Sequence, residues 1–220
     1  MAVAVVIIDI RASVEHVDLA PELKRLAQSL EAEVPGSMFQ VAWGDEVEGV
    51  LPRPADTWDL YLHVRKTLGD LGFYMGVGFG EISGGSSGIA GQSVHDLNGT
   101  AFKAAREAVE AAKADTEAAL ALEFSVFGQP ELTAALSAYP RIINLAARRM
   151  TRTQRAYFSD LIVGYRQSAI ARRHGVRQPS VSLALQRAGA DQLDAMAGGL
   201  RALLAFVAAY THWGGGEAGR

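Results

Sequence analysis

Residues 167–188, QSAIARRHGVRQPSVSLALQRA, carry the most specific pattern in this chain of 220 residues. Val181 and Leu185 are four residues apart, which predicts one inward-packing face of a helix. Gly175 precedes that helix and suits the left-handed backbone of a tight turn that follows another helix. The stretch therefore predicts two helices joined by a short turn.

Other positions of the stretch fit the same interpretation. Ile170 and Ala171 are expected to pack inward on the first helix, where the small Ala171 lets the two helices cross closely. Val176 is expected to fill the core below the turn. Pro179 falls in the first turn of the second helix, where its missing N–H does no harm. We expect the two helices to form one preformed unit.

Charge is segregated along the chain. Residues 1–140 contain nine basic and twenty acidic residues, a balance of −11, whereas residues 141–190 contain ten arginines, no lysine and one acid, Asp160. A basic segment beside an acidic domain indicates a polyanionic partner for the basic segment. A solvated surface in which arginine replaces lysine has the same composition, and helical hairpins also serve in protein docking. The positive charge coincides with the helical pair, which favours DNA binding.

Residues 150–189 resemble the helix-turn-helix of LuxR-type regulators and the DNA-reading region of sigma factors. Thr151 is then the N-cap of a scaffold helix. The resemblance implies that residues 178–187 are a recognition helix in the major groove of double-stranded DNA. Leu183 stands where relatives often have a polar reader, which implies weaker base discrimination or contact with a thymine methyl group. The implied base contacts are Gln178, Ser180, Ser182 and Gln186, and the implied phosphate contacts are Arg172, Arg173, Arg177 and Arg187.

Strands and helices alternate in the first part of the chain. Hydrophobic periodicity predicts strands at residues 3–8, 37–43, 47–51, 73–82 and 120–127, and helices at residues 19–34, 57–71 and 97–113. Their order is that of a split βαβ, ferredoxin-like unit. From residue 131 onward every segment is helical in pattern. The predicted fold class is α+β, with a ferredoxin-like domain at residues 1–128, an all-α domain at residues 129–213 and a disordered tail at residues 214–220.

Glycine occupies alternate positions of the strand at residues 73–82, at Gly76, Gly78 and Gly80. Such glycines remove the side chains from one face of a strand. Either a ligand or another backbone can then approach that face closely.

Four pieces of the first half are similar, in order, to the catalytic palm of class III nucleotidyl cyclases and, more loosely, of diguanylate cyclases. They are VVIIDI (5–10), VAWGDEVEGV (41–50), YMGVGFGEISGGSSG (74–88) and GTAFKAAR (99–106). The resemblance implies that Asp9 and Asp45 bind Mg²⁺, the ion that neutralises a triphosphate and activates a hydroxyl in such palms. It also implies a nucleotide ligand, with Gly44, Glu46, Gly80 and Arg106 as candidate contacts.

Two positions depart from the cyclase pattern. Phe102 stands where cyclases have an asparagine that orients the ribose, and Val41 stands where adenylyl cyclases have a base-selecting lysine. Neither side chain offers the required hydrogen bond, so cyclase catalysis is not expected.

The whole chain resembles the SatD family of bacterial proteins more closely. Glu81 is interpreted as a hairpin-edge or salt-bridge residue, with Arg106 as a candidate partner. The resemblance implies a palm followed by a helix-turn-helix and a regulatory role. The positions that fit the pattern of the family are Asp9, Asp45, Glu46, Gly80, Glu81, Gly99, Ala101, Ala105 and Arg106.

These observations predict a cytoplasmic regulator that binds double-stranded DNA as a homodimer and whose palm senses a ligand or dimerises. The chain contains no cysteine, which excludes disulfides and thiolate metal sites. No apolar run approaches the roughly 20 residues of a membrane-spanning helix. One alternative is a divergent Mg²⁺-dependent nucleotidyltransferase or phosphohydrolase that uses Asp9 and Asp45. Another is an interaction protein whose palm only dimerises.

Overall fold

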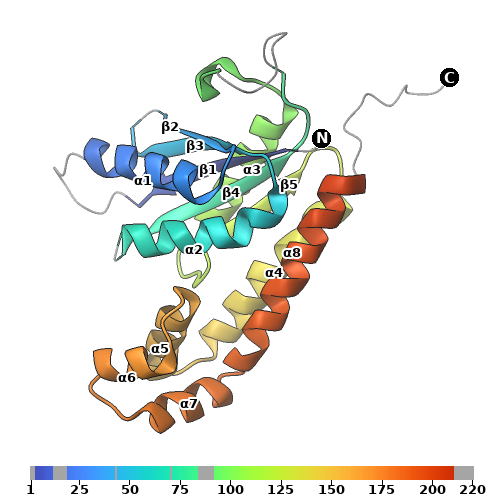
Figure 1. Ribbon diagram of the computed structural model, residues 1–220. Helices are drawn as coiled ribbons and strands as arrows, with labels where there is room; N and C mark the ends of the chain where they lie inside the picture. Colours follow the sequence, from blue (N-terminus) through green and yellow to red (C-terminus); the bar gives the residue numbers. More distant parts are fainter. Residues whose placement is uncertain (1–2, 12–18, 43, 70, 84–91, 211–220) are drawn as a thin grey trace.

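The computed structural model describes residues 3–11, 19–42, 44–69, 71–83 and 92–210. Its strands are β1 (Ala4–Ile10), β2 (Met38–Val41), β3 (Glu46–Leu51), β4 (Phe73–Phe79) and β5 (Leu122–Val126). They form one mixed sheet in the order β2-β3-β1-β4-β5 (Figure 1). The central strand β1 pairs antiparallel with β3 and β4, whereas β5 pairs parallel with β4.

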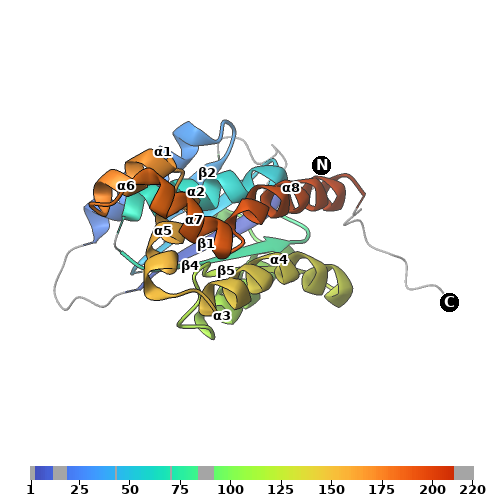
Figure 2. The same ribbon diagram turned by 90° about the horizontal axis from the view of Figure 1, so that it is seen from below.

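Helices cover both faces of this sheet. They are α1 (Ala20–Glu33), α2 (Thr57–Leu68), which follows the short helix η1 (Pro54–Asp56), and α3 (Thr100–Lys113). Helices α1 and α2 lie on one face and α3 on the other (Figures 1 and 2). Val6 and Ile8 of β1 belong to the main apolar core, whereas Val5 and Ile7 pack with α3. β1 reads as a continuous apolar run because it is buried on both faces.

The backbone of α3 occupies the space that side chains would take at the alternate glycines in and just after β4. A Cβ atom at Gly76 would lie 2.3 Å from the nitrogen of Val109, and one at Gly78 would lie 2.1 Å from the nitrogen of Ala105. A Cβ atom at Gly80 would lie 2.6 Å from the nitrogen of Ala101. Of the two alternatives left open by the glycine pattern, the structure therefore selects the approach of another backbone.

The second half of the described chain is helical. It contains α4 (Pro130–Arg148), α5 (Arg152–Ile162), α6 (Gln167–Arg173), α7 (Gln178–Arg187), η3 (Ala190–Gln192) and α8 (Leu193–Tyr210). Helix α4 packs against β5, and α8 packs against α4, α2 and η1. The short helices α5, α6 and α7 contact one another and lie at the end of α4 and α8 that points away from the sheet (Figure 1).

The α+β fold class is confirmed, as a five-stranded mixed sheet with interleaved helices followed by a helical region. Three predicted boundaries are wrong by three residues: the strand expected at residues 73–82 ends at Phe79, and the helix expected at residues 97–113 begins at Thr100. The helix expected at residues 57–71 ends at Leu68, because Gly69 takes a positive φ of 59° and stops it before Gly72. The domain boundary after residue 128 stays a prediction, and buried apolar residues form one continuous cluster across it. The predicted tail at 214–220 lies outside the described residues. Within the described parts of the chain, none of the helices is both long and apolar enough to cross a bilayer.

The contact between β4 and α3 generates a stability prediction. We expect Gly78→Ala to lower the free energy of unfolding by about 3 kcal/mol or more, because the added methyl group meets backbone that cannot rotate away. Gly198→Ala is the matched control, since Gly198 lies in α8 with nothing near its missing Cβ atom. Removal of a helical glycine should raise stability by about 1 kcal/mol or leave it unchanged. Urea denaturation followed by circular dichroism measures both, and equal effects of the two substitutions would contradict the packing described.

Candidate functional site

Local sequence signals define the unit of α5, α6 and α7. Thr151 begins α5 as predicted, because its hydroxyl accepts a hydrogen bond from the backbone N–H of Gln154 at 3.2 Å. The side chain of Gln154 in turn accepts from the backbone N–H of Thr151 at 2.9 Å. This reciprocal capping box satisfies two N–H groups that a helix start otherwise leaves unpaired. Gly175 has a φ of 65° and turns the chain between α6 and α7, also as predicted.

Apolar side chains hold the three helices together. Ile170 of α6 and Val181 and Leu185 of α7 are at most 2% exposed, and Phe158 of α5 is 1% exposed. Ala171 is also buried, so these predicted inward positions are confirmed. These side chains form the core of the unit, and its outer surface is mostly polar and charged, with Tyr165, Val176 and Leu183 as exposed large side chains besides.

One predicted core position is wrong. The sequence places Val176 in the core below the turn, but this side chain is 39% exposed. Its backbone N–H donates to the carbonyl of Ala171 at 2.9 Å, which closes the turn without the side chain. The side chain that joins the turn to α5 is His174, whose Nε2 lies 2.9 Å from a carboxylate oxygen of Asp160 and whose ring packs edge-on against Tyr157.

The outer face of α7 is polar with one apolar side chain. Gln178 donates a hydrogen bond to the side chain of Gln167 at 2.8 Å, which links the starts of α7 and α6. Leu183 is 47% exposed, while Ser182 is half-buried. The predicted readers that are exposed are Gln178, Ser180 and Gln186.

Most arginines of this region are exposed and have no acidic partner among the described residues. Arg173 is the exception among the predicted phosphate contacts: it lies 3.4 Å from Asp160 and stacks over the ring of Tyr165 at 4.7 Å. Unpaired guanidinium groups on one small unit make its surface strongly positive. The arginines without an ion pair to any described acid are Arg149, Arg152, Arg155, Arg166, Arg172, Arg177 and Arg187.

A second candidate site is a cluster of acids at the end of β1. Asp9 lies directly opposite Glu46 in the pairing of β1 with β3. Arg106 of α3 donates two hydrogen bonds to Glu46, at 2.6 and 2.7 Å, and one to Glu48 at 2.7 Å. Lys113, seven residues later on the same face of α3, lies 2.6 Å from Asp9. Helix α3 therefore places two cations over three strand carboxylates.

The structure brings together only part of the predicted ligand set. Asp9, Glu46 and Arg106 meet in the cluster, and Gly44 turns the adjacent hairpin with a φ of 72°. Gly80 does not join them, because it follows β4 at the opposite end of the sheet, roughly 20 Å away at the usual rise of an extended strand.

The predicted partner of Arg106 is also wrong. Arg106 pairs with Glu46 and Glu48 rather than with the exposed Glu81. Two members of the cluster, Lys113 and Glu48, are not among the residues predicted from the sequence. Their spacing carried the signal, since Lys113 is two helical turns after Arg106 and Glu48 follows Glu46 on the same face of a strand.

The pKa values of Asp9 and Lys113 in this cluster are both raised, each for its own reason. Burial raises the pKa of Asp9; the ammonium of Lys113 opposes this shift, and the charges of Asp45 and Glu46 add to it. Burial lowers the pKa of Lys113, but hydrogen bonds and charges of Asp9 and Glu110 outweigh burial and raise it. The pKa of Asp9 is therefore raised mainly by burial, and the pKa of Lys113 is raised by the acids beside it.

The donor set does not by itself fit Mg²⁺. The carboxylate of Asp9 is already engaged by Lys113, and no group of three or more histidine, cysteine or acidic side chains among the described residues is arranged around a metal position. A hard cation needs several oxygen ligands. Binding of Mg²⁺ by Asp9 and Asp45 stays a prediction that requires displacement of Lys113.

Comparison with known proteins adds no assignment. No protein-family model matches this chain, and no curated protein matches it significantly.

The raised pKa of Asp9 generates a pH prediction. The folded protein binds the proton of Asp9 more tightly than the unfolded chain does, in which the pKa of this carboxyl is near 3.8. Protonated Asp9 therefore contributes stability below pH 3.8, and this contribution is lost as pH rises through the raised pKa of the folded state. Asp9→Asn keeps the shape and stays neutral. We expect the stability of Asp9→Asn, measured as its free energy of unfolding relative to that of wild type, to increase between about pH 4 and about pH 7.

Urea denaturation at the two pH values measures this difference. Lys113→Met is the companion variant, because it removes the cation beside Asp9 and should lower stability at neutral pH. A difference between Asp9→Asn and wild type that does not change with pH would refute the description of the cluster.

Proposed function

We propose that this chain binds double-stranded DNA through a helix-turn-helix formed by α6 and α7 and acts as a transcriptional regulator. The observation that carries the proposal is the set of seven exposed arginines on and beside α5–α7 without a described acidic partner. Such a set attracts phosphates and releases their counterions on binding.

The arrangement of the helices supports the same proposal. The turn between α6 and α7 spans four residues with glycine at a positive φ, as in DNA-binding helical pairs. Gln178 and Ser180 are exposed at the start of α7 and are suited to contact base edges. Arg172 lies just before the turn and Arg177 is its last residue, and both are exposed and suited to contact phosphates. In Figure 1, α6 and α7 lie at the end of the molecule away from the sheet.

In this proposal the first half is a cyclase-like palm that senses a ligand or dimerises. The strand order β2-β3-β1-β4 and its antiparallel pairing agree with a ferredoxin-like unit, to which β5 adds one edge strand. Phe102 and Val41 in place of the cyclase asparagine and lysine, and the Asp9–Lys113 ion pair, favour sensing over catalysis.

We further propose that the regulator is a homodimer, because a two-fold protein matches a two-fold operator. Ile142 and Leu145 of α4 are 54% and 55% exposed, and large apolar side chains at a surface support an interface.

Electrophoretic mobility shifts of the full chain with a random-sequence duplex at low salt test the proposal. We expect binding that weakens steeply with salt. Arg172→Gln together with Arg177→Gln should reduce the slope of log affinity against log salt by about one for each of the two arginines that binds a phosphate in the wild type.

Arg25→Gln with Arg53→Gln is the matched control. It removes the same charge from exposed arginines outside α5–α7 that pair with Glu22 and Asp56, and it should leave the slope unchanged. The proposal fails if wild type does not shift the duplex at about 50 mM salt, or if the control lowers affinity as much as the α6–α7 double variant.

A selection of binding sites from random duplexes tests base readout separately. We expect Gln178→Ala to relax the preference at one base pair at a cost of about 1–3 kcal/mol in binding to the preferred site. An unchanged site preference would remove Gln178 from the readers.

A further inference from the structure

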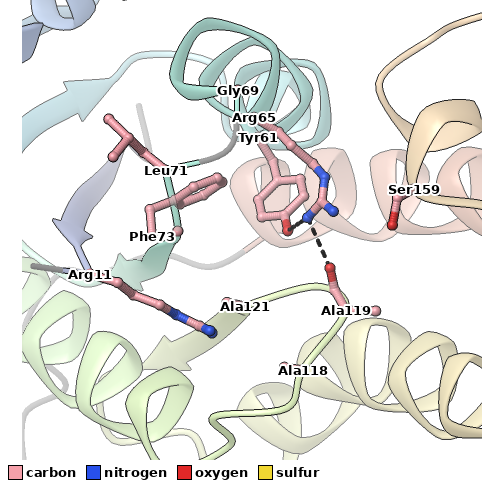
Figure 3. A pocket seen from close by; sticks show the side chains of 11 residues that line it. Arg11, Tyr61, Arg65, Gly69, Leu71, Phe73, Ala118, Ala119, Ala121 and Ser159 are labelled. Carbon is pink, nitrogen blue, oxygen red and sulfur yellow. Dashed lines mark hydrogen bonds between the residues drawn. The ribbon is translucent and has the colours of Figure 1, made fainter. Parts of the chain in front are cut away.

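A pocket of about 380 Å³ lies between the sheet region and the helical unit. Its walls come from the end of β1, the C-terminal part of α2, the start of β4, the loop before β5, and α5. Figure 3 shows Arg11 and Arg65 reaching the pocket from different elements, with Tyr61 and Phe73 between them and Ser159 on the α5 side. The volume falls in the range of pockets that hold small organic molecules.

Two guanidinium groups line this pocket, and neither forms an ion pair with an acid in the described part of the chain. Arg65 donates to the carbonyl of Ala119 at 3.0 Å and to the hydroxyl of Tyr61 at 3.5 Å. Arg11 donates to the carbonyl of Thr116 at 3.2 Å. None of the described residues that line the pocket is acidic, so no described carboxylate neutralises the two positive charges there.

Arg11 also carries an unsatisfied donor. Its Nε is buried and has no hydrogen-bond partner among the described atoms, while its guanidinium group stacks over the ring of Tyr74 at 4.2 Å. A buried donor without an acceptor is unfavourable and uncommon in native proteins. Because this Nε has almost no accessible surface, an anion in the pocket would meet the terminal guanidinium nitrogens of Arg11 rather than its Nε, together with Arg65.

Neighbouring groups favour an anion. Burial raises the pKa of Tyr61, so its hydroxyl stays neutral at neutral pH and adds no negative charge. An adjacent hollow shares Arg65 and Ser159 and adds Lys66 and Arg173. Its acid, Asp160, is engaged by His174 at 2.9 Å.

We propose that this pocket binds a small organic anion through a phosphate or carboxylate group held by Arg11 and Arg65. The flat guanidinium fork suits either group. Ser159 of α5 lines the same pocket, so the bound anion touches both the sheet region and the unit proposed to bind DNA. The site is the ligand-sensing site of the proposed regulator, but anion binding itself does not depend on DNA binding.

Isothermal titration calorimetry of the full chain at constant ionic strength tests the site with two probes, inorganic pyrophosphate and citrate. We expect at least one to bind with a Kd of about 1 mM or lower. Binding of pyrophosphate alone assigns a phosphate ligand, binding of citrate alone a carboxylate ligand, and binding of both a site that recognises either group. Binding of neither overturns the proposal.

Arg11→Gln should weaken binding of the probe about tenfold or more, because it removes a charge-assisted hydrogen bond. Ser159→Glu is a second variant, at a half-buried position whose side chain has no hydrogen bond to a described side chain. The added negative charge should repel the anion. The midpoint of thermal unfolding should stay near that of wild type. Arg172→Gln, which changes the charge on exposed α6 outside the pocket, should bind as wild type does.

Equal weakening by Arg172→Gln and the pocket variants would mean that the probe senses overall charge, which overturns the site. Because the titration contains no DNA, failure of DNA binding leaves its result intact. Conversely, a Ser159→Glu variant that no longer binds the probe but still shifts a duplex separates the two proposals.

Discussion

Helix α3 lies against β4 at backbone distance, and the rest of the first half depends on that contact. Gly76 and Gly78 present no Cβ atom, so the backbone nitrogens of Val109 and Ala105 occupy the space that side chains would otherwise take. The small side chains of Ala101 and Ala105 complete the contact from the helix side. Close packing without voids stabilises both elements and fixes the rotation of the helix about its axis.

That rotation determines the electrostatics at the end of the sheet. Arg106 and Lys113 lie on the face of α3 that points toward β1 and β3, where Asp9, Glu46 and Glu48 emerge. The two cations face three carboxylates, and the pKa of Asp9 is raised mainly because this side chain is buried, with the charges of Asp45 and Glu46 adding to the shift. The ion pairs of Arg106 and Lys113 join α3 to β1 and β3, and Lys113 engages the carboxylate of Asp9 that a metal ion would need.

The helical half is attached by its long helices rather than by its small unit. Helix α8 is joined to α2 by the ion pair between Arg201 and Asp59, and α4 is joined to β5 by the pair between Arg141 and Glu123. Helices α5–α7 extend beyond these attachments. The pocket lined by Arg11 and Arg65 lies where α5 meets the sheet region (Figure 3). Helix α5 contacts α7 and also lines the pocket, so it would connect a DNA site on α7 with an anion site in the pocket. If DNA and the anion prefer different positions of α5, binding of one changes the affinity for the other.

The sequence by itself determined the elements and the three-helix unit of α5–α7. Periodicity located the strands and helices, and Gly175, Ile170, Val181 and Leu185 specified the turn and its core, because such signals are local and depend on neighbours within a few residues. The sequence also showed that the first part of the chain is acidic and the later part basic, because charge balance depends only on composition.

Only the tertiary structure decided which partner each residue meets. The glycines of β4 allowed a ligand or a backbone, and the choice followed from where α3 packs. Arg106 met Glu46 rather than Glu81, and His174 rather than Val176 joined the turn to α5. The pocket between Arg11 and Arg65 joins segments that are distant in sequence, and no local pattern encodes the position at which a helix from the second half comes to rest against the first.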